Sequence, residues 1–492
     1  DNISGNIWKS HTAFPPASGF TVAWAGSPGA AVITWTGSTP LNGRGVTFYN
    51  IGGALPTGIV AGKGYFTTGA SGATSNIALT PSGGAVTISD NGSGTQTAGV
   101  NGFPSNQAND IGNLIWQSGG VTETGSQTYA LMNGLTGQSD ATLAANAVQG
   151  QYYFSIADWK VHVYSIGNPA TAMPGLELAV DASCAFIRSV NYITVQNIDM
   201  RYCAASALTV SASTNVKARD MSISWVGGGN VSGIDVRYGD AADVVLVSSN
   251  VVFERIRASQ CYDAGLTVQP LAAANPVSNV TFRNSIIQTC TQGCFQMETA
   301  GAQLTNISVH NNTCYNPATN WSEGQRWGAG GASEDGQQIG TLHSGAASPI
   351  PSNLNYFNNV FDQIGLCGIE HPSAGTPAGS QWQGAGNMAF DYNLYRRISG
   401  ATPTICLVSP GAGNPTIATW AASDQTPAQE VHGLLTGLDP KFTDPANGNF
   451  TPQAGSPLLA AGTNLSGSGV VWDINHKPRP ASGAITIGAI QQ

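Results

Sequence analysis

Three carboxylate-bearing stretches between residues 233 and 298 contain the residue types that acid–base chemistry requires. The stretch CYDAGLTVQP (261–270) places Asp263 two residues ahead of a glycine that opens a short alternating run, and similar runs carry Asp235 and Glu298. Hydrolysis of a glycosidic bond needs two carboxyl groups, one protonated and one ionised. Asp263 can equally shape its own turn by accepting backbone hydrogen bonds. The choice depends on whether the three runs lie side by side.

An alignment of the runs on the glycine before each one predicts that they do. Side chains alternate along a strand, so the second and fourth residues of each run are expected to point outward. The glycines and their runs are Gly233 with IDVRY, Gly265 with LTVQP, Gly293 with CFQME, and Gly365 with LCGIE. The predicted outward residues are Asp235, Arg237, Thr267, Gln269, Phe295, Met297, Cys367 and Ile369, followed at the fifth place by Tyr238, Pro270, Glu298 and Glu370.

The spacing between strands predicts one shared patch. Neighbouring strands lie about 4.8 Å apart, so matching positions two strands away are roughly 10 Å apart. Arg237 can also be the plain salt-bridge partner of Asp235, and Glu298 and Glu370 lie at strand ends, where exposed carboxylates are common. The predicted patch consists of the catalytic candidates Asp235, Asp263 and Glu298 with the substrate-binding candidates Arg237, Tyr238 and Gln269.

Further candidates lie in loops around these runs. Residues 316–342 (NPATNWSEGQRWGAGGASEDGQQIGTL) hold Trp321, Arg326 and Trp327, whose flat rings and guanidinium would suit a sugar-stacking wall, although the tryptophans can equally pack the loop against its own strands. His343 and His371 flank the same region as candidate bases, and each can equally be structural. Nothing around the GGG at 227–229 resembles a phosphate-binding loop.

An acidic loop is the one place where the sequence allows a metal. Asp240 and Asp243 in YGDAADV are interpreted as loop residues, and an acidic loop beside a groove is a possible calcium site. Otherwise no cofactor is expected. The eight cysteines lie between Cys184 and Cys406 without zinc-type spacing, so we expect packing residues with a disulfide among them.

A repeat begins near residue 184 and positions these runs. Seven phrases, among them VQNIDMRYC, FERIRASQC and FRNSIIQTC, can be laid over one another with separations of 23, 35, 29, 27, 47 and 33 residues. A constant unit with variable insertions is typical of a solenoid whose loops differ from coil to coil. The polar residues at the common position are Asn197, Asp220, Arg255, Asn284, Asn311, Asn358 and Asp391, and most residues six places later are apolar, as a continuous core requires.

The phrases SVNYITVQNIDMRY, NVTFRNSIIQTC, NISVHNNTCYN and NLNYFNNVFDQIG resemble coils of a right-handed parallel β-helix, the pectate-lyase-like architecture. The ending GSPLLAAGTN…DINHKPRPASGAITIGAI resembles that of many secreted β-helix proteins, and residues 44–98 resemble a β-module of phage tails and other appendages. The resemblance implies an all-β fold with a glycan-active groove along one outer face. It also implies a homotrimer if the protein is a tailspike, or a monomer if it is a secreted enzyme.

The residue patterns along the chain predict three segments. Residues 1–110 are expected to form an N-terminal β-rich module of antiparallel strands, because short strand patterns alternate there with Gly, Pro, Asn and Ser turns. Residues 111–183, with a short helix near SDATLAANAVQGQ, are expected to bridge or cap the solenoid. Residues 184–492 are expected to form the parallel β-helix with loop insertions and a closing C-terminal segment.

The composition limits the partners. Charged residues make up only 9% of the 492 residues and the net charge is −9, which argues against nucleic acid and anionic membranes. No apolar run reaches the roughly 18 residues that span a bilayer, so no membrane insertion is expected. The first residues, DNISGNIWKS, lack the basic and apolar regions of a signal peptide, so a secreted or extracellular protein, or a phage-particle component, would have lost its signal or left the cell another way.

The residues favour a hydrolase of an extracellular, neutral or weakly charged polysaccharide or oligosaccharide. Asp235, Asp263 and Glu298 offer the two carboxyl groups that this chemistry needs. A lyase acting on a uronate is the second choice, because it needs a base and cations that are scarce here, and an acidic chain repels a polyuronate. A non-catalytic glycan-binding adhesin or tailspike is the third.

Overall fold

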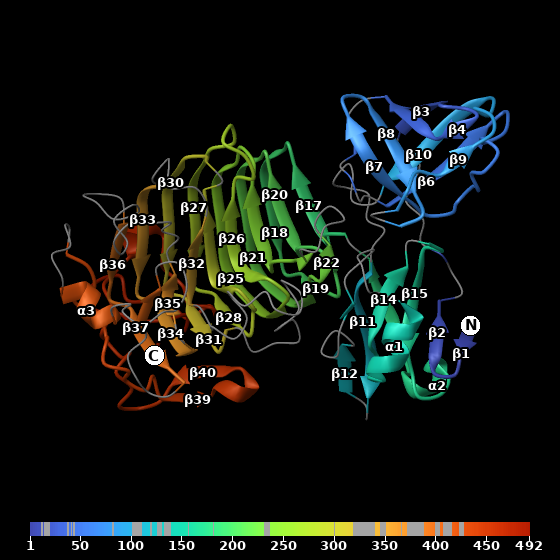
Figure 1. Ribbon diagram of the computed structural model, residues 1–492. Coiled ribbons are helices and arrows are strands. Elements are labelled where there is room, and N and C mark those ends of the chain that lie inside the picture. Colours follow the sequence, from blue (N-terminus) through green and yellow to red (C-terminus); the bar gives the residue numbers. More distant parts are fainter. Residues whose placement is uncertain are drawn as a thin grey trace.

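The computed structural model describes the chain outside the following residues: 11–12, 14–19, 37–38, 41, 43–44, 81–82, 101–110, 119–120, 125–129, 132–138, 156, 181, 231–236, 300, 318–339, 345–350, 366, 371–387, 399–403, 407–415 and 423–427. The described part is all-β, with antiparallel sheets toward the N-terminus and parallel sheets after residue 184 (Figure 1). No helix in it is long and apolar enough to cross a bilayer.

Six strands near the N-terminus close into an antiparallel barrel around a core that includes Trp24, Ile33, Phe48 and Tyr65. Alternating apolar residues drive closure, because each strand buries one face. The predicted N-terminal antiparallel module is confirmed. The barrel strands are β3 (Phe20–Ala25), β5 (Val32–Trp35), β6 (Gly45–Ile51), β7 (Tyr65–Ser71), β8 (Thr74–Ala78) and β10 (Thr95–Val100), and β4 (Gly29–Ala30) pairs with β9 (Thr87–Ile88) beside them.

A second sheet joins the first residues of the chain to residues 130–164. Its strands, in spatial order, are β1 (Asn2–Ser4), β2 (Ile7–Lys9), β15 (Lys160–Tyr164), β14 (Tyr152–Ser155) and β13 (Ala130–Leu131), so residues 1–110 contribute to two sheets. The predicted short helix is confirmed as α1 (Asp140–Asn146), which Ser139 caps by accepting a hydrogen bond from the Thr142 amide. A second helix, α2 (Pro169–Ala172), follows.

A three-stranded sheet connects this region to the parallel part. It consists of β12 (Val121–Thr124), β11 (Ile111–Ser118) and β16 (Glu177–Val180). Gly112 lies so close to Gly229 that a Cβ added there would be 2.4 Å from the Gly229 nitrogen. Ile115 and Ala179 also bury their side chains against Ala204, so the sheet packs on the first parallel strands.

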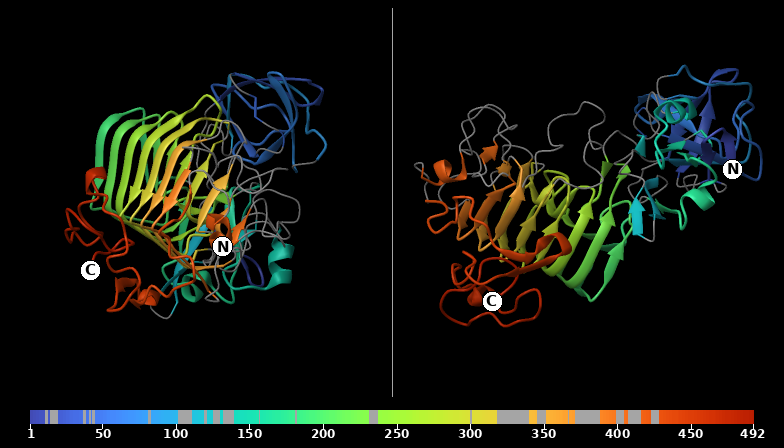
Figure 2. Two further views of the ribbon diagram at one scale, coloured as in Figure 1. Left: turned by 90° about the vertical axis from the view of Figure 1, so that its left-hand side faces the viewer. Right: turned by 90° about the horizontal axis from the view of Figure 1, so that it is seen from below.

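The C-terminal two-thirds of the chain contains two parallel sheets whose strands alternate along the sequence (Figures 1 and 2). In spatial order the eight-stranded sheet is β17 (Ala185–Arg188), β20 (Leu208–Ser211), β24 (Ala242–Val245), β26 (Ala264–Gln269), β29 (Gly293–Glu298), β32 (Thr341–Ser344), β35 (Cys367–Glu370) and β38 (Thr404–Cys406). The twelve-stranded sheet contains, in chain order, β18 (Asn191–Gln196), β19 (Asp199–Arg201), β21 (Thr214–Val226), β25 (Ser249–Cys261), β27 (Val277–Arg283), β28 (Ile286–Gln288), β30 (Leu304–His310), β31 (Thr313–Tyr315), β33 (Ser352–Phe357), β34 (Val360–Ile364), β36 (Met388–Asp391) and β37 (Leu394–Arg397).

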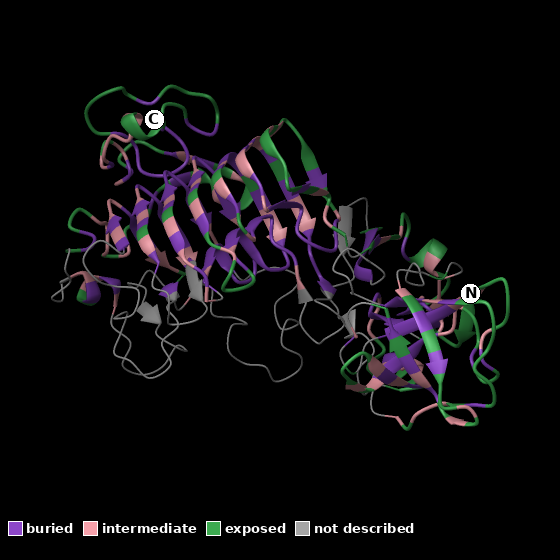
Figure 3. Ribbon diagram, turned by 90° about the horizontal axis from the view of Figure 1, so that it is seen from above, coloured by how far each residue is buried: buried purple, intermediate pink, exposed green. Residues whose placement is uncertain are grey.

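One continuous core fills the space between the parallel sheets. Alternate residues of strands such as β27 and β33 in the twelve-stranded sheet are buried, which gives the banded pattern of Figure 3, whereas β20 and β24 of the eight-stranded sheet are buried throughout. Residues in matching register stack on one another, as do the rings of Phe253 and Phe282 at 5.4 Å. The apolar positions six residues after the repeat's polar column are buried as predicted: Cys203, Val226, Cys261, Cys290 and Ile364 all belong to this core.

The residues of the repeat's polar column lie at bends of the twelve-stranded sheet. Each of them from Asn197 (φ 58°) to Asn358 (φ 57°) has a left-handed backbone conformation. The residues one place later form a buried ladder. The side chains of Asn312 and Asn359 each accept a hydrogen bond from a backbone N–H of the preceding coil. Asn393 is the last asparagine of this ladder, and its side chain donates a hydrogen bond of 2.7 Å to Glu430. Their amides satisfy turn groups that no water reaches.

The C-terminal segment folds back along the twelve-stranded sheet (Figure 2, right). It contains α3 (Ile417–Ala422), β39 (Phe442–Asp444), β40 (Asn449–Pro452) and two 3-10 turns at Pro445–Asn447 and Ser466–Ser468. Arg479 is 5% exposed and fastens the segment by donating to Asn284 Oδ1 at 3.2 Å and to the Gly488 carbonyl at 2.7 Å.

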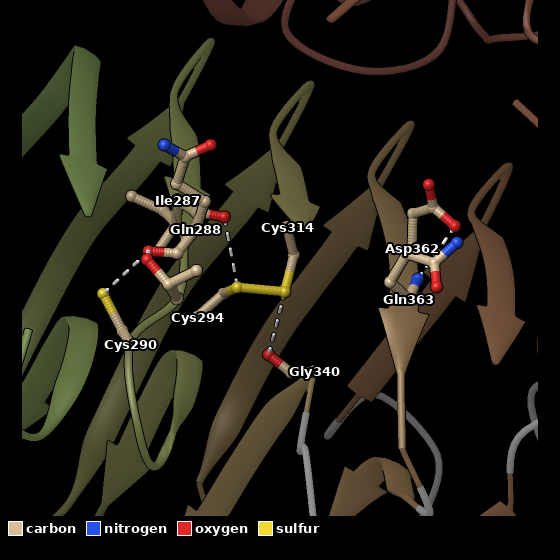
Figure 4. Close-up of a disulfide and its surroundings, with 9 residues drawn as sticks. Ile287, Gln288, Cys290, Cys294, Cys314, Gly340, Asp362 and Gln363 are labelled. Atoms are coloured by element: carbon tan, nitrogen blue, oxygen red, sulfur yellow. Dashed lines mark hydrogen bonds between the residues drawn. A yellow bond between two sulfur atoms is a disulfide. The ribbon is translucent and has the colours of Figure 1, made fainter. Parts of the chain in front are cut away.

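Two disulfides cross-link the parallel region. Cys294 on β29 is bonded to Cys314 on β31 (Figure 4), and Cys184 is bonded to Cys203. Cys261 and Cys290 are free thiols inside the core. The expectation of packing cysteines with a disulfide among them is therefore confirmed for the described cysteines.

Candidate functional site

The outward face of the eight-stranded sheet brings four polar side chains into one row. Thr209, Asp243, Thr267 and Gln296 are paired in register on β20, β24, β26 and β29. Their neighbours along each strand, such as Val244 and Val268, are completely buried in the core. Alternation therefore fixes the four polar residues on the outer face.

Asp243 occupies the place that the sequence alignment predicted for Asp235, and that part of the alignment was wrong. The strand that pairs with Leu266–Gln269 is Ala242–Val245, eight residues beyond the predicted run. Both runs place an aspartate between two apolar residues, so local pattern alone fits either of them. Asp243 was interpreted as a loop residue. The apolar, valine-rich run VVLV directly after it was the available sign that it belongs to a strand.

Arg237 and Tyr238 lie outside the parallel sheets. They form β23 (Arg237–Tyr238), which pairs antiparallel with β22 (Gly229–Asn230). The Tyr238 carbonyl accepts a hydrogen bond of 2.8 Å from the Gly228 amide. The predicted register for residues 234–238 fails because the chain turns through this hairpin before the next parallel strand begins.

The third run was aligned one residue out of register. Phe295 and Met297 were predicted to point outward, but both are completely buried in the core, and Gln296 and Glu298 take the outward positions. A shift of one residue moves every side chain of a strand to the other face. The structure pairs Gly293 with Ala264 rather than with Gly265.

The surroundings of Asp243 favour the protonated form of its carboxyl group. It is 8% exposed, and the Ser206 hydroxyl donates to its Oδ2 at 3.3 Å. Burial, with a smaller contribution from the nearby Asp263 carboxylate, raises the pKa of Asp243 to about 7 against the opposing hydrogen bonds from Thr209 and Ser206. Its Oδ1 is buried with no hydrogen-bond partner among the described residues.

Asp263 directly precedes β26, is 5% exposed, and is near enough for its charge to act on Asp243. Its backbone fixes the turn, since its amide donates to the Gly239 carbonyl at 3.2 Å and its carbonyl accepts from the Gln292 amide at 3.3 Å. The Asp240 side chain also shapes this turn, because its Oδ1 accepts a hydrogen bond from the Ala264 amide at 2.9 Å.

Gln269 and Glu298 are neighbours, as the sequence predicted. They lie at the ends of β26 and β29, and the Gln269 amide donates a short hydrogen bond to Glu298 Oε2. Both side chains are half-buried. This amide–carboxylate pair lies two residues further along the strands than the row of Asp243, so the same face carries both.

The other predicted residues are placed only in part. His343 lies on β32 in register with Met297, and Glu370 on β35 is in register with Leu342, which continues the Asp243 row rather than the Glu298 position predicted for it. The remaining predicted residues Asp235, Trp321, Arg326, Trp327 and His371 lie outside the described residues.

No group of three His, Cys, Asp or Glu side chains in the described part of the chain is arranged to hold a metal ion. Asp240, one of the two residues behind the calcium expectation, uses a carboxyl oxygen for the Ala264 amide.

Comparisons with known proteins give little further information. No protein-family model matches the chain, and no curated protein matches it. A solved structure described as "Glycoside hydrolase" is similar with a TM-score of 0.31 and 9% identity, over 87% of this chain and 77% of that one. A likeness at this TM-score supports no conclusion about fold or activity.

Proposed function

We propose that this protein is a glycoside hydrolase whose catalytic carboxyl groups are Asp243 and Asp263. The observation behind the proposal is a pair of buried carboxyl groups, 8% and 5% exposed, in which the pKa of Asp243 is raised to about 7. Environments that push two carboxyl pKa values apart separate the acid from the base. Asp243 would be the general acid and Asp263 the ionised partner.

The reaction follows from these roles. Asp243 gives its proton to the glycosidic oxygen as the bond to the anomeric carbon breaks, and Asp263 either activates the attacking water or attacks that carbon itself. Water supplies the hydroxyl group at the anomeric carbon in both cases. If Asp263 activates the water, Asp263 takes the proton of that water and passes it to solvent, from which Asp243 is reprotonated. If Asp263 attacks the carbon, Asp243 takes the proton of the water that releases the sugar from Asp263. Gln269 and Glu298 would bind sugar hydroxyls further along the same face. Arg237, Tyr238, Trp321, Arg326, Trp327, His343 and Glu370 remain proposed substrate contacts.

We also propose that residues 184–492 form a right-handed parallel β-helix that acts on an extracellular saccharide. The regular alternation of strands between two parallel sheets supports the solenoid. The two disulfides, Cys184–Cys203 and Cys294–Cys314, favour an oxidising compartment outside the cytosol. No cofactor enters this mechanism.

A panel of polysaccharides digested by the purified protein and analysed by mass tests the proposal. Hydrolysis adds one water to each cleaved bond, whereas elimination adds none. Asp243→Asn and Asp263→Asn are each expected to reduce cleavage by about 10³-fold, with saccharide binding retained. Asp199→Asn changes an exposed carboxylate on β19 and is the matched control.

Three results would contradict the proposal. An unsaturated product identifies a lyase. Binding of a saccharide without cleavage by the unmodified protein identifies a non-catalytic glycan-binding protein. Full cleavage by both asparagine variants places the chemistry elsewhere.

A further inference from the structure

A polar cavity of about 490 Å³ lies between the twelve-stranded sheet and the C-terminal segment, away from the Asp243 row. Its floor is formed by side chains of β18, β21, β25 and β27, and one wall by residues 469–476. The repeat's polar column, which the proposed function does not use, reaches this floor at Asn197, Asp220, Arg255 and Asn284.

The floor consists of two adjacent columns in which opposite charges are stacked. Along one column the backbone register pairs Arg219 with Glu254 and Glu254 with Arg283. In the other, the Arg255 guanidinium binds Asp220 of the preceding coil through two hydrogen bonds of 2.7 and 3.0 Å. Coils stack about 4.8 Å apart, so each charge lies within reach of the next.

Both carboxylates of the floor are already engaged by arginines. Arg283 lies 2.6 Å from Glu254, Arg255 lies 3.3 Å from Glu254, and Arg255 holds Asp220. The cavity lining contains four Lys or Arg and two Asp or Glu, a difference of two positive charges. Lys217 and Arg219 are the two further cations of the lining. Arg219 donates to Gln196 Oε1 at 2.8 Å and lies 3.9 Å from Asp220, further than the arginines that hold the two carboxylates.

This local excess opposes the charge of the whole chain, which is −9 with only 18 Lys and Arg. At physiological salt the Debye length is about 8 Å, so a ligand inside the cavity responds to the lining and hardly to distant carboxylates. The guanidinium of Arg219 suits a planar carboxylate in particular, because it can donate two parallel hydrogen bonds.

The wall offers an aromatic surface. Trp472 is 45% exposed and lines the cavity together with Val471. The wall is held in place by Arg283, which donates to the Ser468 carbonyl at 2.9 Å, and by His476, whose Nε2 lies 2.9 Å from Asp220. A fixed indole ring beside cations and the amides of Gln196 and Asn197 can contact the C–H face, the anionic group and the hydroxyls of one sugar ring.

We propose that this cavity is a second binding site, specific for an acidic saccharide unit whose carboxylate lies between Lys217 and Arg219 and whose ring packs on Trp472. The site does not depend on the proposed hydrolase activity, since it would serve a glycan-binding protein equally. An enzyme would use it to retain a partly acidic polymer while the distant carboxyl pair cleaves neutral linkages.

Titration calorimetry of the full chain with tri-galacturonate, its fully methyl-esterified form and inorganic sulfate tests the proposal. The free acid is expected to bind at least tenfold more tightly than the ester, because the ester keeps the rings and loses the charge. Arg219→Ala and Lys217→Ala should each weaken binding of the acid about tenfold, and Trp472→Ala about threefold. Arg201→Ala removes a more exposed cation outside the cavity and should change nothing.

Circular dichroism of each variant establishes that it is folded. Equal affinity for acid and ester would overturn the proposal, as would absence of binding by the acid. Sulfate binding as tight as that of the acid would show a bare anion site instead, and unchanged affinity in Arg219→Ala and Trp472→Ala would place the ligand elsewhere.

Discussion

The two parallel sheets shift the pKa values of carboxyl groups on their outer faces in opposite directions. On the eight-stranded sheet, Asp243 has hydroxyl groups and a second aspartate as neighbours, and burial raises its pKa to about 7. On the twelve-stranded sheet, burial also favours the neutral forms of Asp220 and Glu254, but Arg255 and Arg283 outweigh it and lower both pKa values. Identical strand stacking thus gives an acid on one face and permanent anions on the other, according to the residue that the adjacent coil supplies.

The depth of burial modifies this contrast. Asp362 on β34 is completely buried and is paired with Arg396, yet burial outweighs the arginine and its pKa is raised. Glu254 is only 4% exposed, but it faces both Arg255 and Arg283, and its pKa is lowered. The balance between burial and the number of arginine neighbours therefore decides the direction of the pKa shift.

The largest expected effect concerns the pH dependence of cleavage. A general acid acts only while protonated, so activity should fall as pH rises through the pKa of Asp243, by about tenfold per pH unit above 7. The pH profile of kcat/KM measures this limb. Asp263→Asn removes a negative neighbour and should lower the Asp243 pKa, which carboxyl ¹³C NMR detects without activity. A pH-independent rate between 7 and 9 would refute Asp243 as the acid.

Removal of Arg255 from the twelve-stranded sheet should leave the carboxylates that it contacts without enough compensating positive charge. Arg255→Met leaves Asp220 without its bidentate partner and Glu254 with one cation fewer. We expect a loss of about 3 kcal/mol in the free energy of unfolding, measured by urea denaturation at pH 7. The loss should shrink at low pH, where protonation removes the unpaired charges. A variant as stable as the parent would mean that the pair contributes nothing.

Glu430 tests whether burial alone can produce the acid-like behaviour of Asp243. Burial raises the pKa of Glu430 to about 8, against hydrogen bonds from Asn393 and Tyr395. The folded state therefore holds a proton that the unfolded state releases near its ordinary pKa, so stability is greatest below that value and falls as pH rises toward 8. Between pH 5 and 7 we expect a fall of about 2 kcal/mol, absent in Glu430→Gln. Parallel curves for the two proteins would contradict this assignment.

An exposed ion pair provides the smallest effect. Arg201 lies 2.6 Å from Asp199 on β19, and both side chains are about half exposed. Arg201→Ala should change the free energy of unfolding by about 0.5 kcal/mol or less. A loss as large as that in Arg255→Met would show that burial is not what separates the two pairs.

The sequence was informative about local pattern and less so about pairing. The antiparallel module, the short helix at Asp140–Asn146 and the buried apolar column after each polar bend follow from short-range periodicity, and the structure contains all three. Gln269 and Glu298 were also correctly placed together. Register was harder to predict, because a one-residue error at Gly293 exchanged the buried and exposed faces of a strand.

The repeat, the alternation of apolar residues and the scarcity of charge were determined by the sequence itself, because each depends on neighbours within one strand or turn. Tertiary structure decided which of two alternating runs, 234–238 or 242–245, joins the parallel sheet. It therefore decided that Asp243, not Asp235, occupies the outer face beside Thr267. It also decided which carboxyl groups face arginines, since the pKa of an aspartate depends on burial and on side chains from other coils, and neither is encoded within its own strand.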